Sequence, residues 1–387
     1  MPINPSPYIQ YGGLWTASQQ ADAKAAGTWP VPPVPYLYTW GIGTDGRIGD
    51  NATTDRSSPV QIGSLTTWLE VAAGYSYFSA SIKTDGTLWT WGQSNVSYGQ
   101  LGLDNTTNYS SPKQVGALTN WSKIQCGGNS MLALKTDGTI WSWGNGADSQ
   151  LGLGNTTSYS SPKQIGSLTN WAYISCMLDS CSTIKNDGSL WVWGRNTFGG
   201  LGNGNTTNVN SPIQIGALTN WSKVANSGFH TIAVKTDGTL WSWGYNVNGQ
   251  LGLNNTTNYS SPVQVGALTN WANVAAHGTF SFALKTDGTI WAWGNNSSGQ
   301  LGLGNTTNYS SPKQIGALTT WSKIAVRLNG SFAIKTDGTL WTWGNGANGQ
   351  NGVGNITNYS SPIQVGSLTS WNNIAGNRSA GIGIARI

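Results

Sequence analysis

Residues able to perform acid–base or metal chemistry are scarce in this chain of 387 residues. Its two histidines, His230 and His277, fall in neighbouring copies of a repeated segment. Two histidines without further ligands do not complete a zinc site, so a polar role in a loop is favoured for both. The sequence contains no motif for a Ser-His-Asp set and no phosphate-binding glycine loop that opens a helix. We therefore predict no catalytic residue, no metal site and no cofactor.

The three cysteines also cluster in two neighbouring repeats. Cys126 and Cys176 occupy the same repeat position, whereas Cys181 lies across a predicted hairpin loop from Cys176. Three cysteines in a chain of this length do not form a disulfide framework. The sequence leaves open whether Cys176 and Cys181 are bridged.

The most regular acidic residues belong to predicted turns. An Asp-Gly pair between apolar alternating segments is a strong signal for a tight β-hairpin, because the turn requires positive φ. We therefore interpret these aspartates as turn residues rather than as a metal or acid site. The lysine two residues before each aspartate is expected to form a modest surface pair with it. The six pairs are Lys83 and Asp85, Lys135 and Asp137, Lys185 and Asp187, Lys235 and Asp237, Lys285 and Asp287, and Lys335 and Asp337.

These turns belong to a repeat of 50 to 52 residues, marked by a Trp-Gly pair that occurs seven times. Each unit contains four short strand-like segments, such as residues 121–126, 131–135, 139–143 and 162–165. Seven sets of four strands predict an all-β, seven-bladed β-propeller with four-stranded blades. The chain enters on a Trp-Gly strand, residues 36–41, and ends on the strand that precedes it in the repeat, residues 381–387. Pairing of these N- and C-terminal strands should close the ring.

Differences between the copies are concentrated in two windows. One links the first and second strands of a unit and the other follows Trp-Gly, and antiparallel pairing puts both on the same face of the disc. Since loops on a rigid scaffold often carry function, we predict a binding face there for a glycan or a protein. The alternative is neutral drift in tolerant loops. The candidate binding residues are Tyr75, Tyr77, Phe78, Phe198, Phe229, His230, Tyr245, His277, Phe280 and Arg327.

The N-terminal segment, residues 1–35, differs from the propeller, residues 36–387. It combines a short Ala-rich helical pattern with a proline-rich linker at residues 31–35. A helix of about ten residues is marginal alone in water, so we predict that this segment anchors the chain to other proteins of an assembly. No signal peptide or membrane-spanning run is evident. The net charge of +5 is spread over the repeats, so no nucleic-acid partner is predicted.

The segment from residue 228 to residue 252, with its Trp-Gly and Gly-Gln-Leu-Gly elements, resembles the repeat of the regulator of chromosome condensation family. The resemblance covers residues 36–387 and implies a seven-bladed propeller with a shared closing blade. Founding members of that family are guanine-nucleotide exchange factors that bind chromatin through a basic tail and use a protruding wedge. Residues 1–35 hold a single lysine, and no unit has an insertion long enough for a wedge, which argues against exchange activity.

The favoured function is a non-enzymatic structural and binding protein of a virion, such as a tail-fibre, decoration or receptor-binding protein of a tailed phage. A charge-poor surface, an N-terminal anchor and variation on one face fit a protein assembled in a host cytoplasm. Its partners would be other virion proteins, through residues 1–35, and a host surface glycan or protein. The alternative is a cytoplasmic interaction scaffold or an exchange-factor-like propeller. An enzyme is least favoured.

Overall fold

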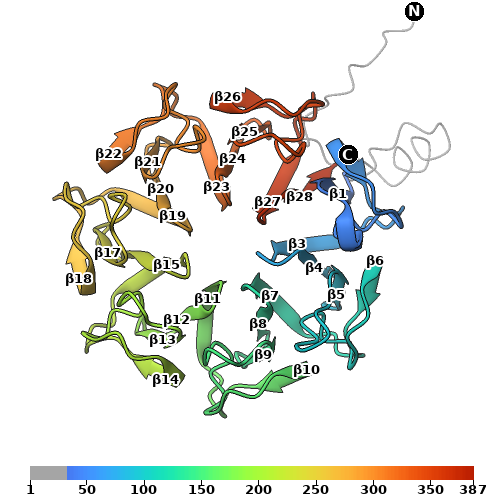
Figure 1. The fold of residues 1–387 in the computed structure, drawn as a ribbon, viewed down its shortest axis with the longest axis horizontal. Helices are drawn as coiled ribbons and strands as arrows, with labels where there is room; N and C mark the ends of the chain where they lie inside the picture. The colour runs from blue at the N-terminus through green and yellow to red at the C-terminus, as the bar shows by residue number, and fades with distance from the viewer. Residues whose placement is uncertain (1–32) are drawn as a thin grey trace, which may run out of the picture. The chain divides into compact units, whose positions relative to one another are not determined.

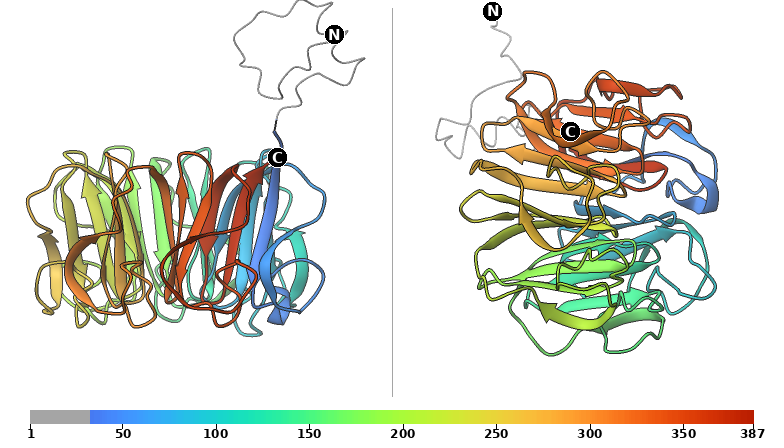
Figure 2. Two further views of the ribbon diagram at one scale, coloured as in Figure 1. Left: turned by 90° about the horizontal axis from the view of Figure 1, so that it is seen from above. Right: turned by 60° about the vertical axis from the view of Figure 1, so that its left-hand side comes forward.

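The computed structural model describes residues 33–387, and the chain divides into two units, residues 1–34 and 35–387. The predicted N-terminal helix and the first two residues of the linker, 31 and 32, lie outside the described residues. The second unit is a ring of seven four-stranded antiparallel sheets, or blades (Figure 1). The strands run between the two faces of a disc (Figure 2). The predicted all-β, seven-bladed fold is therefore confirmed. No helix in the described part of the chain is long and apolar enough to cross a membrane.

The strands occupy the same four radial positions in every blade. The innermost strands are β3 (Trp68–Ala73), β7 (Trp121–Cys126), β11 (Trp171–Met177), β15 (Trp221–Asn226), β19 (Trp271–His277), β23 (Trp321–Arg327) and β27 (Trp371–Gly376). The second are β4 (Phe78–Lys83), β8 (Ser130–Lys135), β12 (Ser180–Lys185), β16 (His230–Lys235), β20 (Phe280–Lys285), β24 (Gly330–Lys335) and β28 (Ala380–Arg386). The third are β5 (Leu88–Gly92), β9 (Ile140–Gly144), β13 (Leu190–Gly194), β17 (Leu240–Gly244), β21 (Ile290–Gly294), β25 (Leu340–Gly344) and β1 (Pro35–Gly41). The outermost are β6 (Tyr109–Gln114), β10 (Tyr159–Gln164), β14 (Val209–Gln214), β18 (Tyr259–Gln264), β22 (Tyr309–Gln314), β26 (Tyr359–Gln364) and β2 (Arg56–Gln61), and a single 3₁₀ turn, η1 (Thr44–Gly46), follows β1.

The ring closes in the blade with strand order β2-β1-β28-β27. β1 pairs with β28 without interruption, from Pro35 opposite Arg386 to Gly41 opposite Ala380. The two ends of the described unit thus form the middle of one sheet, as the repeat order predicts. The outermost strands begin three residues before the Ser-Pro proline, which is earlier than predicted. Their pairing with the third strand is irregular between Tyr159 and Lys163, and this irregularity accommodates a proline that has no N–H to donate.

The Trp-Gly tryptophans join neighbouring blades. Trp243 is fully buried, and its indole Nε1 donates a hydrogen bond to the carbonyl oxygen of Gly200 in the preceding blade, at 3.0 Å. Gly202 follows in the same loop with φ +79°, and a Cβ there would lie 2.5 Å from that nitrogen. The Leu-Gly of the repeat is therefore glycine because the next blade's tryptophan lies against it. The same bond is donated by Trp40, Trp91, Trp143, Trp193, Trp293 and Trp343.

The turn aspartates act as predicted, but their lysines do not. Asp237 Oδ1 accepts hydrogen bonds from the Thr239 N–H and hydroxyl, which hold the pKa of Asp237 below its usual value. The Lys235 ammonium instead lies 3.6 Å from the ring centroid of Trp241 and 4.9 Å from that of Trp221. The four salt bridges among the described residues include none of the six predicted Lys–Asp pairs, so that prediction is wrong. Burial between two rings favours cation–π contact over a solvated ion pair, and it lowers the pKa of Lys235.

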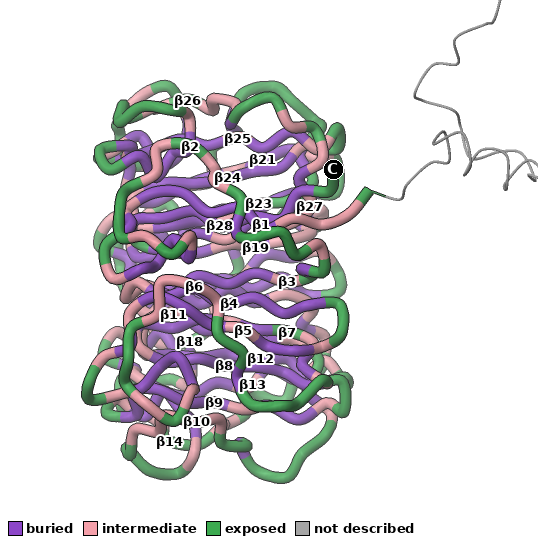
Figure 3. Tube along the Cα trace, turned by 90° about the vertical axis from the view of Figure 1, so that its right-hand side faces the viewer, coloured by how far each residue is buried: buried purple, intermediate pink, exposed green. Residues whose placement is uncertain are grey.

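The core lies between the blades, and the exposed chain is concentrated in the loops at the two faces and the rim (Figure 3). The seven innermost strands surround an axial cavity of about 220 Å³. At its Glu70 end, the Glu70 carboxylate accepts hydrogen bonds from Lys123 Nζ at 3.2 Å and from Asn373 Nδ2 at 3.3 Å. These contacts join the three neighbouring blades of β27, β3 and β7.

Candidate binding face

The strand registers place both variable windows on one face of the disc. The Tyr245 N–H, directly after β17, donates a hydrogen bond to the carbonyl oxygen of Phe229, in the loop between β15 and β16, at 3.0 Å. Equivalent bonds join Asn145 to Asn129 and Arg195 to Asp179. We call the face formed by these loops the variable face. The opposite face carries the Asp-Gly turns and the connections between blades, and we call it the constant face.

Three of the predicted residues form an aromatic cluster on the variable face. Phe198, Phe229 and Tyr245 are all partly exposed. The ring centroids of Phe198 and Tyr245 lie 4.7 Å apart. The Phe229 centroid lies 5.8 Å from that of Phe198 and 6.3 Å from that of Tyr245. Val247, in the loop between β17 and β18, adds an apolar side chain that is 56% exposed. The two blades that begin with β11 and β15 therefore present three adjoining aromatic rings on this face.

This aromatic cluster departs from the repeat. Among the five other blades, the blade of β3 to β6 has Tyr77 and Tyr98 at the positions of Phe229 and Phe198, but Gln93 at that of Tyr245. In the blade of β23 to β26, the residues that correspond to Phe198, Phe229 and Tyr245 are Asn348, Asn329 and Asn345.

Two predicted tyrosines lie in the loop between β3 and β4. Tyr77 has φ +70°, and the Arg47 guanidinium carbon lies 3.8 Å from its ring centroid. Tyr75 stacks on the His277 ring with centroids 6.0 Å apart, although the two belong to the first and fifth blades in chain order. The exposed Arg378 lies 5.6 Å from the ring of Tyr75. Arg47 and Arg378 were not among the predicted residues, because only the folded ring shows that their guanidinium groups lie against the rings of Tyr77 and Tyr75.

Five predicted residues are buried rather than presented at the face. Phe78 and Phe280 pack in the cores between blades. His230 bridges two blades: its Nδ1 is 2.7 Å from Ser227 Oγ and its Nε2 is 2.7 Å from Ser281 Oγ. Burial holds the pKa of His230 and of His277 to about 3, so both rings are neutral at physiological pH. Arg327 is also fully buried. The part of the chain that the structure describes contains no group of three potential metal ligands from His, Cys, Asp or Glu.

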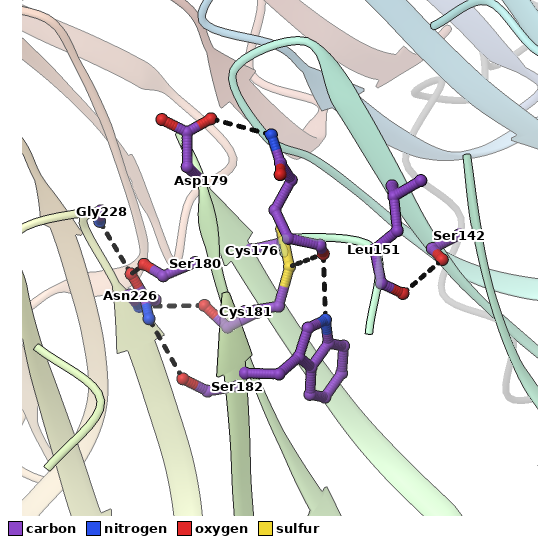
Figure 4. Close-up of a disulfide and its surroundings, with 12 residues drawn as sticks. Ser142, Leu151, Cys176, Asp179, Ser180, Cys181, Ser182, Asn226 and Gly228 are labelled. Carbon is purple, nitrogen blue, oxygen red and sulfur yellow. Dashed lines mark hydrogen bonds between the residues drawn. A yellow bond between two sulfur atoms is a disulfide. The ribbon is translucent and has the colours of Figure 1, made fainter. Parts of the chain in front are cut away.

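The sequence left open whether Cys176 and Cys181 are bridged, and the structure shows that they are. Cys176 in β11 and Cys181 in β12 are paired directly across the hairpin and form a disulfide (Figure 4). The hairpin tip carries Asp179, whose Oδ1 accepts a hydrogen bond from Gln150 Nε2 of the preceding blade at 3.2 Å. Cys126 remains a buried free thiol, and burial raises its pKa. The bridge therefore supports a loop of the variable face next to the aromatic cluster.

The fold and this face define a seven-bladed β-propeller that holds variable loops on a closed ring, an architecture used by protein-interaction scaffolds and exchange factors. The chain belongs to the RCC1-like domain family: the model of that domain matches residues 35–330, and the model of the regulator of chromosome condensation (RCC1) repeat matches residues 337–376. The family resemblance drawn from the repeats is thus confirmed.

Individual relatives are similar over limited stretches or at low identity. The E3 ubiquitin-protein ligase HERC2 of Homo sapiens is 31% identical over 112 residues, which are 28% of this chain and 2% of that protein. The ultraviolet-B receptor UVR8 of Arabidopsis thaliana is 34% identical over 111 residues, 28% of this chain and 24% of that protein. The chain thus spans only a small part of the curated relatives it matches.

Among solved structures, human WBSCR16 is similar with a TM-score of 0.81 and 20% identity, over 91% of this chain and 99% of that one. Prp20p from Saccharomyces cerevisiae, described with its binding to Gsp1p and histones, gives a TM-score of 0.79 and 17% identity over 99% of this chain and 97% of that one. At these identities the likeness concerns the fold alone.

Proposed function

We propose that this chain is a non-enzymatic interaction scaffold that binds a protein partner on its variable face, through the aromatic cluster of Phe198, Phe229 and Tyr245. The observation that carries the proposal is the cluster itself: three partly exposed rings in mutual contact stand where the blade of β23 to β26 has asparagines. Membership of a family with an interaction-scaffold fold supports the same class of function.

Physical chemistry favours these rings as the energetic centre of an interface. Aromatic side chains bring a large contact area with few rotatable bonds, so they lose little conformational entropy on binding. Val247, two residues after Tyr245, is an exposed apolar side chain of the same loop, while the Arg195 side chain, which lies 3.8 Å from an Asp179 oxygen, provides a polar border. An apolar centre with a polar rim is the usual anatomy of a protein interface.

The test is a binding experiment with a variant that copies another blade. Phe198→Asn, Phe229→Asn and Tyr245→Asn together reproduce the residues of the β23 to β26 blade, so the loops should keep their conformation. The matched control replaces three half-exposed leucines of the constant face, Leu118, Leu168 and Leu218, by alanine. A partner is first enriched from lysate with the wild-type chain, then purified, and its Kd is measured for all three proteins.

We expect the triple asparagine variant to raise Kd by about 100-fold or more, because residues at the centre of an interface each contribute about 1–2 kcal/mol or more. The leucine variant should change Kd less than threefold. Equal weakening by both variants, or no weakening by the first, would contradict the proposal. If the chain bound a purified surface glycan instead of a protein, the proposed binding face would still hold, and the partner would be a glycan.

A virion setting is a second hypothesis, and its support is the charge-poor surface, with charged residues at 9% of the chain. The comparisons favour a cellular interaction scaffold over it. Anchoring to virion proteins through residues 1–35 concerns a segment outside the described residues. Sequencing of the neighbouring genes tests this hypothesis: capsid and tail genes on both sides would support it, and their absence would leave the cellular scaffold.

A further inference from the structure

The side chain of Arg327, at the end of β23, is fully buried without a counter-charge. Its Nη2 donates hydrogen bonds to the Asn345 carbonyl oxygen and to Asn351 Oδ1, both at 2.6 Å. Nε and Nη1 have no acceptor among the described residues. A guanidinium carries five N–H groups, so three of them remain without a partner. None of the salt bridges in residues 33–387 involves Arg327.

This arginine is accommodated by residues that depart from the repeat together. Asn351 stands where every other blade has a buried leucine or isoleucine, and it is itself fully buried. Gly330 stands opposite Arg327 in the hairpin of β23 and β24, and a Cβ there would overlap the guanidinium carbon. Gly376, in the next blade, would place a Cβ 2.9 Å from the Arg327 Cβ. The aliphatic residues that correspond to Asn351 are Ile48, Leu101, Leu151, Leu201, Leu251 and Leu301.

Arg327 carries one positive charge, which persists at neutral pH. Burial lowers the pKa of Arg327 to about 9, which leaves the guanidinium protonated. His277, at the equivalent position of the preceding blade, is held neutral by its burial and then by the charge of Arg327. The Phe332 ring lies 5.4 Å from the guanidinium carbon. Such a cation–π contact offsets only part of the cost of burying an ion.

We infer that Arg327 binds a small monovalent anion of the size of chloride, enclosed between the blade of β23 to β26 and the closing blade. Nε or Nη1, neither of which has an acceptor among the described residues, would donate to this anion, and its charge would neutralise the guanidinium. Complete burial favours a compact ion over phosphate or a larger polyanion. This site is separate from the aromatic cluster and does not depend on the proposed function.

The direct test uses the full chain crystallised with sodium bromide, because bromide can replace chloride and is located by its anomalous scattering. We expect an anomalous peak within hydrogen-bond distance of Arg327 Nε or Nη1. An anomalous map with no bromide peak at Arg327, together with ordered water on these nitrogens, would overturn the inference.

A solution test compares melting temperatures in sodium chloride and sodium gluconate at equal ionic strength. Wild-type protein should melt about 2–4 °C higher in chloride, since an anion that binds only the folded chain stabilises it. The variant Arg327→Met with Asn351→Leu copies Met177 and Leu201 of the β11 to β14 blade, and its melting temperature should not depend on the anion. An equal chloride effect in both proteins would contradict the inference. If the double variant does not fold, the bromide experiment decides.

Discussion

The constant and variable regions of this propeller differ in what their residues touch. On the constant side and between blades, each residue repeats one contact around the ring: Trp243 to the Gly200 carbonyl, or Lys235 between Trp221 and Trp241. On the variable face the contacts occur once, as in the cluster of Phe198 and Tyr245. A residue that contacts the next blade can change only if its partner changes as well. Sequence variation is therefore tolerated where side chains meet solvent or one another, and the ring remains intact.

Ring closure should produce the largest effect on the constant framework. Deletion of residues 380–387 removes β28, which lies between β27 and β1 and buries Ile382 and Ile384. The closing blade then loses both of its inner pairings, and we expect the melting temperature to fall by about 10–20 °C, or cooperative unfolding to disappear. Differential scanning calorimetry measures this. Deletion of Ile387 alone, which lies outside the strand and is 56% exposed, is the control and should leave the melting temperature within about 1 °C.

The contact between blades can be tested at a single glycine. Gly202→Ala places a Cβ 2.5 Å from Trp243 Nε1 and also forces alanine to adopt φ +79°. Gly216→Ala is the matched control, because Gly216 has φ +61° but no atom within 4 Å of the added Cβ. We expect both to lower the free energy of unfolding through backbone strain, and Gly202→Ala to lower it by about 1–3 kcal/mol more. Equal losses in urea titrations would show that the tryptophan contact is not tightly packed.

The buried histidines predict a dependence on pH. His230 and His277 have pKa values of about 3 in the folded chain, below the ordinary value of 6.5, so the unfolded chain binds more protons. Their stabilising contribution is present above pH 6.5 and is lost as the pH falls towards 3. At pH 5 the loss is about 2 kcal/mol for each histidine.

Urea titrations at pH 7 and pH 5 measure this loss. The variant His230→Ser with His277→Met copies Ser180 and Met177 of another blade and should lose less stability between the two pH values than the wild type. An unchanged difference would show that neither histidine causes the loss of stability between pH 7 and pH 5.

The fold could be predicted from the repeat, because the repeat specifies which strands pair and how many times. The number of blades, the closing strands and the role of the Asp-Gly turns follow from residue types at fixed spacing. The Lys235 contact could not be foreseen, since a lysine two residues from an aspartate looks like an ion pair until the two tryptophan rings are placed around it. The cysteine bridge needed the strand register, which sets Cys176 directly opposite Cys181. Asn351 was detectable as a departure from Gly-Gln-Leu-Gly, but its contact with Arg327 was not.

The smallest effect on stability is expected on the variable face, and one strand allows the comparison. Trp241 lies at the constant end of β17 and Tyr245 directly follows its variable end, and both are partly exposed. Trp241 packs against Lys235 and Trp221 and donates through Nε1 to the Thr239 hydroxyl at 2.9 Å. Trp241→Asn should therefore cost about 3–5 kcal/mol.

Tyr245→Asn should cost less than about 1 kcal/mol. Among the aromatic residues described, Tyr245 contacts only the partly exposed rings of Phe198 and Phe229. Asparagine also stands at the equivalent position of three other blades. The same urea titration measures both variants. If Tyr245→Asn were as destabilising as Trp241→Asn, the aromatic cluster would belong to the framework, and its departure from the repeat would serve folding. A small loss of stability together with weaker partner binding would instead show that this face was free to vary because it does not hold the ring together.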